Sequence, residues 1–281
     1  MIVNQAQMDE INAIQYEIFK SFHSVCEQLN LKYYLVHGSA LGALRHHGFF
    51  PMDDDIDVAM PRCDYDILMK EGQKYIGNKY FIQSYLSEAD YPLVFGKIRD
   101  CDTAFIQPVL SNFNVNQGIY IDVFPIDNYP VSNMKINLLK RKNWFSRLRV
   151  DMRFKYERKT SFKSKLFETI ALIFFPSWKK ARNVFCSTYD KVPYTGKVIV
   201  RGGKRKEVGM PFELFGKPTK IMFEGVESYI PEKISDYLEL IYGDYMNYEP
   251  MGKDMVSESE VKISADIFDT KKPYTAFIGK S

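Results

Sequence analysis

Residues 37–62 read HGSALGALRHHGFFPMDDDIDVAMPR, and this stretch decides the fold. The apolar run 33–36 ahead of it predicts a buried strand. Gly38 and Ser39 then form a turn, and residues 40–47 predict a short helix with Ser39 as its N-cap. The first turn of such a helix offers backbone N–H groups and a positive dipole end, which suit a phosphate.

An acidic run forms the second half of the stretch. Asp53, Asp54 and Asp55 are consecutive, and Asp57 follows after one apolar residue. Alternate residues of a strand share a face, so Asp55 and Asp57 are expected to point the same way, about 6–7 Å apart at the backbone. Two such carboxylates can converge on one hard cation such as Mg²⁺. Asp53 shares this face by parity, and the sequence leaves open whether it is a ligand or a nearby loop acid.

One further acid stands in an apolar strand. Residues 118–124 read GIYIDVF, and Asp122 lies on the face opposite Ile119 and Ile121. A buried carboxylate is costly unless it has a partner. Asp122 is therefore either a salt-bridged or capping acid, or the third carboxylate of a metal site that an adjacent strand completes. Because perturbed acids cluster at working sites, the second interpretation is favoured.

Three cations are candidates for binding the phosphates of a donor. Lys97 and Arg99 share one face of the predicted strand 94–99, and a cationic pair suits a diphosphate. The alternative for this pair is an exposed edge strand with protective charges. Arg45 could meet a phosphate, or it could pair with an acid of 53–54 and fix the loop.

Together these motifs resemble a known family. A Gly-Ser turn and helix before an Asp-x-Asp strand is similar to the nucleotidyltransferase superfamily, with its polymerase-beta-like palm. The string from Gly38-Ser39-x-Leu41-Gly42-x-x-Arg45 to Asp53-Asp54-Asp55-Ile56-Asp57-Val58-x-Met60-Pro61-Arg62 resembles the LicD branch. Members of that branch are bacterial phosphocholine transferases that act on glycans, and their relatives include the fukutin group. The stretches 97–100, 118–125 and 242–246 also resemble the family, so the likeness spans about 1–128 and, more weakly, 219–246.

The resemblance implies an α/β (α+β) fold: a nucleotidyltransferase palm whose mixed sheet is flanked by helices, plus a basic helical insertion. It implies that Asp55, Asp57 and Asp122 are catalytic and bind Mg²⁺ or Mn²⁺, with Asp53 as an optional further ligand. Asp122 would be a third ligand or the base that takes the proton of the attacking hydroxyl. The phosphates of the donor would lie on Gly38, Ser39, Arg45, Lys97 and Arg99.

The implied reaction moves phosphocholine, or a similar phospho-alcohol, from CDP-choline or another CDP-alcohol to a glycan hydroxyl, with release of CMP. The acceptor would be a glycan or lipid-linked glycan of a lipopolysaccharide, teichoic acid or capsule. One rival is nucleotidyl transfer to a small alcohol with loss of pyrophosphate. The other is a non-catalytic binding module with this fold, which the crowding of acids on one face disfavours.

The middle of the chain differs in character from its ends. We divide the chain into a catalytic core at 1–132, a basic-aromatic helical subdomain at 133–195, and strands and a helix at 196–281 that complete the domain. Residues 135–165 contain 12 basic and 2 acidic residues, so this segment carries a charge of +10 in a chain of net charge +3. It is a solvated face, a site for an anionic acceptor, or a docking surface for anionic lipid.

Periodicity predicts the remaining elements. Helices are expected at 8–29, 62–75 and 232–242, and between 133 and 189 with a break at Pro176. Strands are expected at 79–83 and 197–201, a hairpin at 219–230, and a pairing of 103–107 with 94–99.

The composition indicates which partners and which cell compartment to expect. The small net charge gives no argument for a nucleic-acid partner. Four cysteines without CxxC spacing fit a reducing compartment. No signal peptide is evident, and the longest apolar run, 170–175, is far too short to span a membrane. We therefore expect a cytoplasmic protein, with peripheral contact at the inner membrane face as a further expectation.

Overall fold

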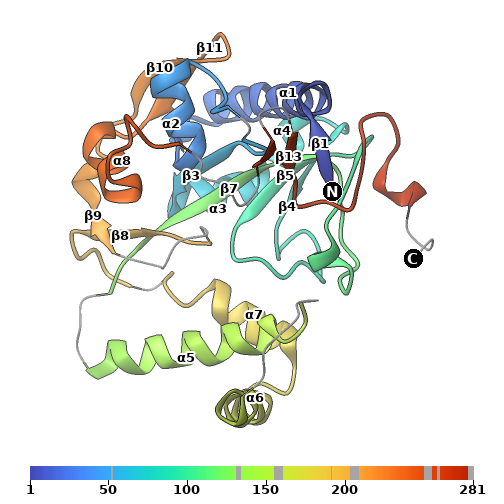
Figure 1. Cartoon of the computed structure of the whole chain (residues 1–281). Coiled ribbons are helices and arrows are strands. Elements are labelled where there is room, and N and C mark those ends of the chain that lie inside the picture. Colours follow the sequence, from blue (N-terminus) through green and yellow to red (C-terminus); the bar gives the residue numbers. More distant parts are fainter. Residues whose placement is uncertain are drawn as a thin grey trace.

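A mixed sheet of seven strands forms the centre of the protein and is flanked by helices (Figure 1). This computed structural model describes residues 1–51, 53–130, 134–154, 161–190, 192–202, 209–249, 255–257 and 260–277. The sheet follows the order β2-β3-β7-β5-β4, and β8 and β9 continue it beside the far end of β7. Its strands are β2 (Tyr34–Leu35), β3 (Asp57–Pro61), β4 (Tyr80–Gln83), β5 (Gly96–Asp100), β7 (Tyr120–Asn128), β8 (Lys197–Val200) and β9 (Met210–Pro211).

The long helix α1 (Gln5–Leu29) covers the sheet as its periodicity predicts. Met8, Ile11, Ile18 and Phe22 recur at helical spacing and are all buried. The helix begins with a capping box between Asn4 and Gln7 and ends at Asn30, whose left-handed backbone closes it at the predicted position.

The pairing of three strands positions the functional residues. β3 runs parallel to β7 with Asp57 opposite Asp122, and β5 runs antiparallel to β7 with Lys97 also opposite Asp122. The sheet is therefore mixed, as expected. β7 touches β3, β5 and β8, and every residue from 120 to 127 is buried. Residue 122 thus lies at a central point that strand pairing fixes on both sides.

One expectation about pairing was wrong, and one alternative is excluded. β6 (Ala104–Ile106) pairs with β14 (Ile267–Asp269) and not with β5. The reason is that β4 and β7 occupy both edges of β5, so no edge is left for a further strand. For the same reason β5 is not an exposed edge strand, and all five of its residues are buried.

The other elements follow the predicted order with shifted ends. Residues 62–75 form α3 (Arg62–Glu71) and α4 (Gln73–Ile76), and 234–242 form α8 (Ile234–Tyr242). The predicted hairpin is β10 (Thr219–Phe223) and β11 (Val226–Ile230), turning at Glu224 and Gly225 with positive φ. The C-terminal stretch returns to β1 (Ile2–Asn4) through β13 (Glu260–Lys262) and β12 (Met255–Ser257). Short 3₁₀ turns are η1 (Pro108–Leu110), η2 (Phe212–Leu214) and η3 (Tyr274–Ala276).

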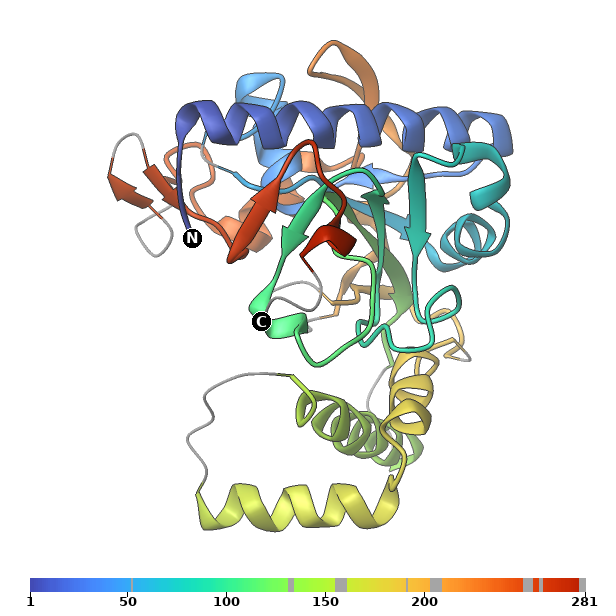
Figure 2. The same ribbon diagram turned by 90° about the vertical axis from the view of Figure 1, so that its right-hand side faces the viewer.

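A layer of three helices lies at one end of the molecule, below the sheet in Figures 1 and 2. It consists of α5 (Met134–Asp151), α6 (Phe162–Phe174) and α7 (Trp178–Cys186), and the break near Pro176 is confirmed. α7 joins the layer to the rest: Trp178 packs on Phe113 at 5.5 Å between ring centroids, and Arg182 donates to the carbonyl of Tyr91. None of the described helices is both long and apolar enough to cross a membrane. The three proposed domain boundaries stay a prediction.

A buried ion pair holds α3 on the central strand. The Nε and Nη2 atoms of Arg62 donate to the two carboxylate oxygens of Asp127 at 2.6 and 2.7 Å. The side chain of Asp127 is 1% exposed and that of Arg62 is 18% exposed. Asp127 raises the pKa of Arg62 against the opposing effect of burial, so the pair is stable as ions.

We expect Asp127→Asn to lower the free energy of unfolding by at most about 3 kcal/mol, because it removes the bidentate partner of the Arg62 guanidinium. Two more distant acids, Asp66 at 3.4 Å and Asp190 at 3.9 Å, remain beside the guanidinium. Urea denaturation of both proteins measures the difference. Asp236→Asn, at an exposed acid of α8, is the matched control and should leave the midpoint unchanged. Equal midpoints for both variants would show that the pair contributes nothing.

Candidate active site

Three aspartates from separate positions of the chain meet where β3 begins. Asp57 is the first residue of β3, Asp122 lies opposite it on β7, and Asp55 reaches in from the loop before the strand. One carboxylate oxygen of each lies within 4.8 Å of the other two. The structure therefore brings together the three acids that the sequence singled out. Asp55 is not in the strand, contrary to our expectation.

A second acidic group overlaps the first. Asp53, Asp54 and Asp55 also place one oxygen each within 4.8 Å of one another, and Asp55 belongs to both groups. Asp53 lies against the first turn of α2 (His37–His46): a Cβ on Gly38 would come 2.1 Å from its Oδ2 atom. Position 38 therefore requires glycine as long as Asp53 keeps this place.

Ser39 has a different role from the predicted one. α2 begins at His37, with Val36 as its N-cap and no side-chain cap, so the prediction of Ser39 as N-cap was wrong. The hydroxyl of Ser39 accepts a hydrogen bond from the backbone N–H of Asp57 at 2.8 Å. Ser39 is 2% exposed. It thus fastens α2 to the start of β3, and its contact with a donor phosphate stays a prediction.

Lys97 supplies a positive charge to Asp122. Its Nζ donates to Oδ1 of Asp122 at 2.5 Å and lies 3.3 Å from the centroid of the Tyr120 ring. Burial raises the pKa of Asp122; Lys97 opposes that shift, and the charge of Asp55 adds to it. Burial lowers the pKa of Lys97 to about 8, although Asp122 acts in the other direction. The two groups stabilise each other's charged forms in a place that disfavours both.

Arg45 and Arg99 make their contacts elsewhere. Nη1 of Arg45 donates to the carbonyls of Tyr248 and Tyr245 at 2.7 and 3.3 Å, so this side chain holds the segment after α8. Arg99 is fully buried and donates to Oε1 of Gln83 and the carbonyl of Gly118. Both guanidiniums donate to the protein's own acceptors, although Nη2 of Arg99 has no hydrogen-bond partner among the described residues. Their role toward a donor phosphate stays a prediction.

Two nearby residues were missed. Nε2 of Gln15 donates to the carbonyl of Asp54 at 2.7 Å and so fixes the acidic loop from α1. Tyr120 lies beneath the Lys97 ammonium. Signals existed for both residues: Gln15 is a polar residue in the apolar stripe between Ile11 and Ile18, and Tyr120 shares the face of Asp122.

The acidic group has the chemistry of a site for a divalent cation. Mg²⁺ prefers oxygen ligands at about 2.1 Å, which places two of them at most about 4.2 Å apart. Separations within 4.8 Å come close to that limit. Asp55 and Asp57 are half-buried, so ions can reach them from solvent, whereas Asp122 is buried. Burial is the main cause of the raised pKa of Asp122, and the charge of Asp55 adds to it; a bound cation relieves repulsion of this second kind.

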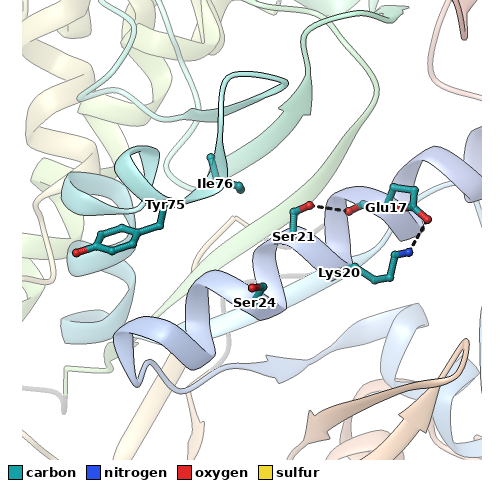
Figure 3. A pocket seen from close by; sticks show the side chains of 6 residues that line it. All are labelled: Glu17, Lys20, Ser21, Ser24, Tyr75 and Ile76. Atoms are coloured by element: carbon teal, nitrogen blue, oxygen red, sulfur yellow. Dashed lines mark hydrogen bonds and ion pairs between the residues drawn. The ribbon is translucent and has the colours of Figure 1, made fainter.

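A pocket on the surface lies away from this site. Figure 3 shows it between α1 and α4, lined by Glu17, Lys20, Ser21, Ser24, Tyr75 and Ile76. Lys20 pairs with Glu17 at 2.6 Å along one side of it. None of the predicted site residues lines this pocket, so it has no part in the chemistry of the three acids.

Comparison with known proteins gives an independent view of the same residues. A family model described as "LicD/FKTN/FKRP, nucleotidyltransferase domain" matches residues 30–176, a range that contains all three acids. It also extends through α5 and α6, beyond the stretch whose likeness was visible in the motifs.

Individual relatives agree with that match. Lipopolysaccharide cholinephosphotransferase LicD of Haemophilus influenzae is 27% identical over 263 residues, which is 89% of this chain and 93% of the relative. The uncharacterized protein RP689 of Rickettsia prowazekii is 27% identical over 41% of this chain and 40% of its own length. The uncharacterized protein RT0683 of Rickettsia typhi is 36% identical over 22% of this chain and 20% of its own length.

The acidic group predicts stabilisation by a divalent cation. At a hundredfold excess over its dissociation constant, Mg²⁺ or Mn²⁺ should stabilise the protein by about 2.7 kcal/mol, because the ion binds the folded form alone. Asp57→Asn should abolish this gain in thermal unfolding, whereas Asp236→Asn should retain it. A gain that persists in Asp57→Asn would place the cation elsewhere.

The buried pair of Lys97 and Asp122 predicts a pH dependence. Lys97→Met leaves Asp122 with a folded-state pKa still further above its unfolded value, so the folded form holds its proton to higher pH. The metal-free variant should therefore lose stability as pH rises above about 4, by at most about 1.4 kcal/mol per pH unit.

Thermal unfolding between pH 4 and 7 in a metal chelator measures this loss. Adding Mg²⁺ at pH 7 should restore part of it, because the cation takes over the charge of Lys97. Lys220→Met is the control, since Lys220 pairs with Glu227 on the surface, and it should follow the parent protein. The same pH profile for Lys97→Met and the parent would contradict the coupling.

Proposed function

This chain belongs to the family of LicD/FKTN/FKRP nucleotidyltransferase domains, and from that premise we propose that it is a metal-dependent transferase of phosphocholine or a similar phospho-alcohol. The donor is a CDP-linked alcohol, and the acceptor is a hydroxyl of a cell-surface glycan. The similarity to a lipopolysaccharide cholinephosphotransferase over 89% of this chain supports an enzyme of that kind.

The convergence of Asp55, Asp57 and Asp122 carries this proposal. Phosphoryl transfer needs positioning and charge neutralisation more than covalent help from the protein. Bound divalent cations supply that neutralisation at the transferred phosphorus and the leaving oxygen. Asp55, Asp57 and Asp122 would hold them, and Asp53 is close enough to Asp55 to contribute from the loop. The parallel β3–β7 pair in a mixed sheet is consistent with a nucleotidyltransferase palm.

The proposed reaction is a single displacement. The acceptor oxygen forms a bond to the choline-bearing phosphorus, and the bond from that phosphorus to the CMP oxygen breaks. The proton of the acceptor hydroxyl passes to a carboxylate. Asp122 takes this role if Asp55 and Asp57 hold the cation without it, because burial raises its pKa and makes it a better base than an exposed aspartate. As a ligand of the cation it would not act as the base. CMP leaves with the electron pair of the broken bond.

Two features near the acids suit the donor: one suits its phosphates, and the other suits its choline group. The first turn of α2, at Gly38 and Ser39, lies against Asp53 and Asp57 and presents its positive dipole end there. The rings of Phe95 and Phe124 lie 4.6 Å apart, and Lys97 Nζ is 5.4 Å from the Phe95 ring. Phe95 is half-buried, so one aromatic surface beside the acids remains accessible to a quaternary ammonium group.

Product analysis tests the proposal. Incubation with CDP-choline, Mg²⁺ and a lipopolysaccharide acceptor should release CMP and label the glycan. Asp57→Asn and Asp122→Asn should each reduce the rate at least about a hundredfold, because each removes a carboxylate that the charge neutralisation depends on. A panel of other CDP-alcohols identifies the alcohol that is transferred.

A control variant and two alternative results complete this assay. Asp236→Asn, at an exposed position of α8, should keep the rate of the parent. Release of phosphocholine in place of CMP would mean attack at the nucleotide's α-phosphorus. Nucleotidyl transfer to a small alcohol is tested separately, with CTP and the alcohol in place of CDP-choline and acceptor, and would release pyrophosphate. Tight donor binding without turnover on any acceptor would mean that the fold serves as a binding module.

A further inference from the structure

Helix α6 carries apolar side chains on its outside. Six of its 13 residues are large, apolar and exposed, and the most exposed are Phe162 at 86%, Ile173 at 72% and Phe174 at 70%. The other three are Leu166, Phe167 and Leu172. Ala171 is the helix's one buried residue. A concentration of this kind on one short helix marks an interaction surface.

The helical repeat separates an inner and an outer face of α6. At 100° per residue, Phe162, Leu166 and Ile173 lie on the side opposite Ala171. Phe167 and Phe174 lie on the flank and contact α5: Trp144 is 5.2 Å from Phe167 between ring centroids. α6 is therefore attached to α5 by one side, while the outer face of Phe162, Leu166 and Ile173 contributes nothing to the described core.

The position of α6 leaves that face accessible. In both Figure 1 and Figure 2, α6 is the helix of the three-helix layer farthest from α1 and the sheet. Its described neighbour is α5, which in turn packs on α7. A flat partner can therefore approach the outer face without meeting the rest of the molecule.

The charge around this face is basic. The sequences of α5, α6 and α7 contain two acids, Asp151 and Glu168, and Asp151 pairs with Arg147. The three helices carry these exposed bases: Arg141, Lys142, Arg147, Lys163, Lys165, Lys179 and Lys180. Within α6 itself, Lys163 and Lys165 stand one turn from the exposed Phe162 and Leu166. Apolar residues bordered by lysines match a surface that is anionic outside and apolar below.

We propose that the outer face of α6 docks this protein on an anionic lipid bilayer. Phe162, Leu166 and Ile173 enter the boundary between headgroups and acyl chains, and the surrounding lysines contact the phosphates of the lipids. A second copy of this chain is disfavoured as the occupant, since two such faces would bring their basic borders together. The inference is independent of which group the acidic site transfers.

Vesicle binding without donor or acceptor tests the inference, so its outcome is separate from that of the transfer assay. The parent protein should sediment with vesicles of phosphatidylcholine and phosphatidylglycerol but far less with phosphatidylcholine alone, and salt should weaken the binding. The double variant F162Q/I173Q should bind at least about tenfold more weakly. Each of K163Q and K165Q should weaken binding by about fivefold.

Matched variants keep the test decisive. L240Q removes an apolar side chain that is 53% exposed from α8 and should bind like the parent. Trp144 and Trp178 are the two tryptophans of the chain, so W178F isolates the fluorescence of Trp144 beside α6. This signal should shift to the blue and be quenched by brominated lipids. Unchanged thermal midpoints show that the variants remain folded.

Two results would overturn the inference. One is binding of F162Q/I173Q that equals binding of the parent, or equal binding to both kinds of vesicle. The other is a parent protein that ignores vesicles and forms a dimer that F162Q/I173Q converts to monomers, which would make the outer face of α6 an interface between copies.

Discussion

The parallel pairing of β3 with β7 is the constraint on which the candidate site depends. It places Asp57 directly opposite Asp122, and side chains at paired positions of neighbouring strands point to the same side of the sheet. Two negative charges are thus held together by backbone hydrogen bonds that neither side chain can break. Asp55 adds a third from the loop, and its charge further raises the pKa of Asp122.

Several neighbouring groups fix this crowded arrangement. Lys97 comes from the antiparallel neighbour at the same level of the sheet and balances Asp122. Ser39 holds the first N–H of β3, and Gln15 holds the loop through the carbonyl of Asp54. The three acids repel one another, so mutual attraction does not bring them together. They are held by hydrogen bonds from α1, α2 and β5, which keep the three negative charges together against their repulsion.

The sequence could predict the acids but not the partners of the arginines. The parity of residues 53–57 and the single acid of an apolar strand are local signals, and each identified a member of the group. Arg45, by contrast, bonds to carbonyls 200 and 203 residues away, and no local pattern encodes such a contact. The mistaken pairing of 103–107 has the same cause, because its true partner lies at 267–269 near the other end of the chain. The role of Ser39 was predicted wrongly because α2 begins at His37, three residues before the predicted start. Ser39 therefore lies in the first turn of the helix and is not its N-cap.

The basic segment shows a further limit of sequence patterns. Its helices were predictable, yet periodicity cannot say which apolar residues a neighbour will cover. In α7, Phe185 and Cys186 are buried in one cluster with Val94, which precedes β5. In α6, by contrast, nearly every large apolar residue stays in contact with water. Packing explains the residues of α7, because their burial stabilises the fold. It does not explain Phe162 or Ile173, whose exposure brings the folded chain no such gain. The physical reason for apolar residues at these two positions therefore has to be sought in what the helix meets outside the protein.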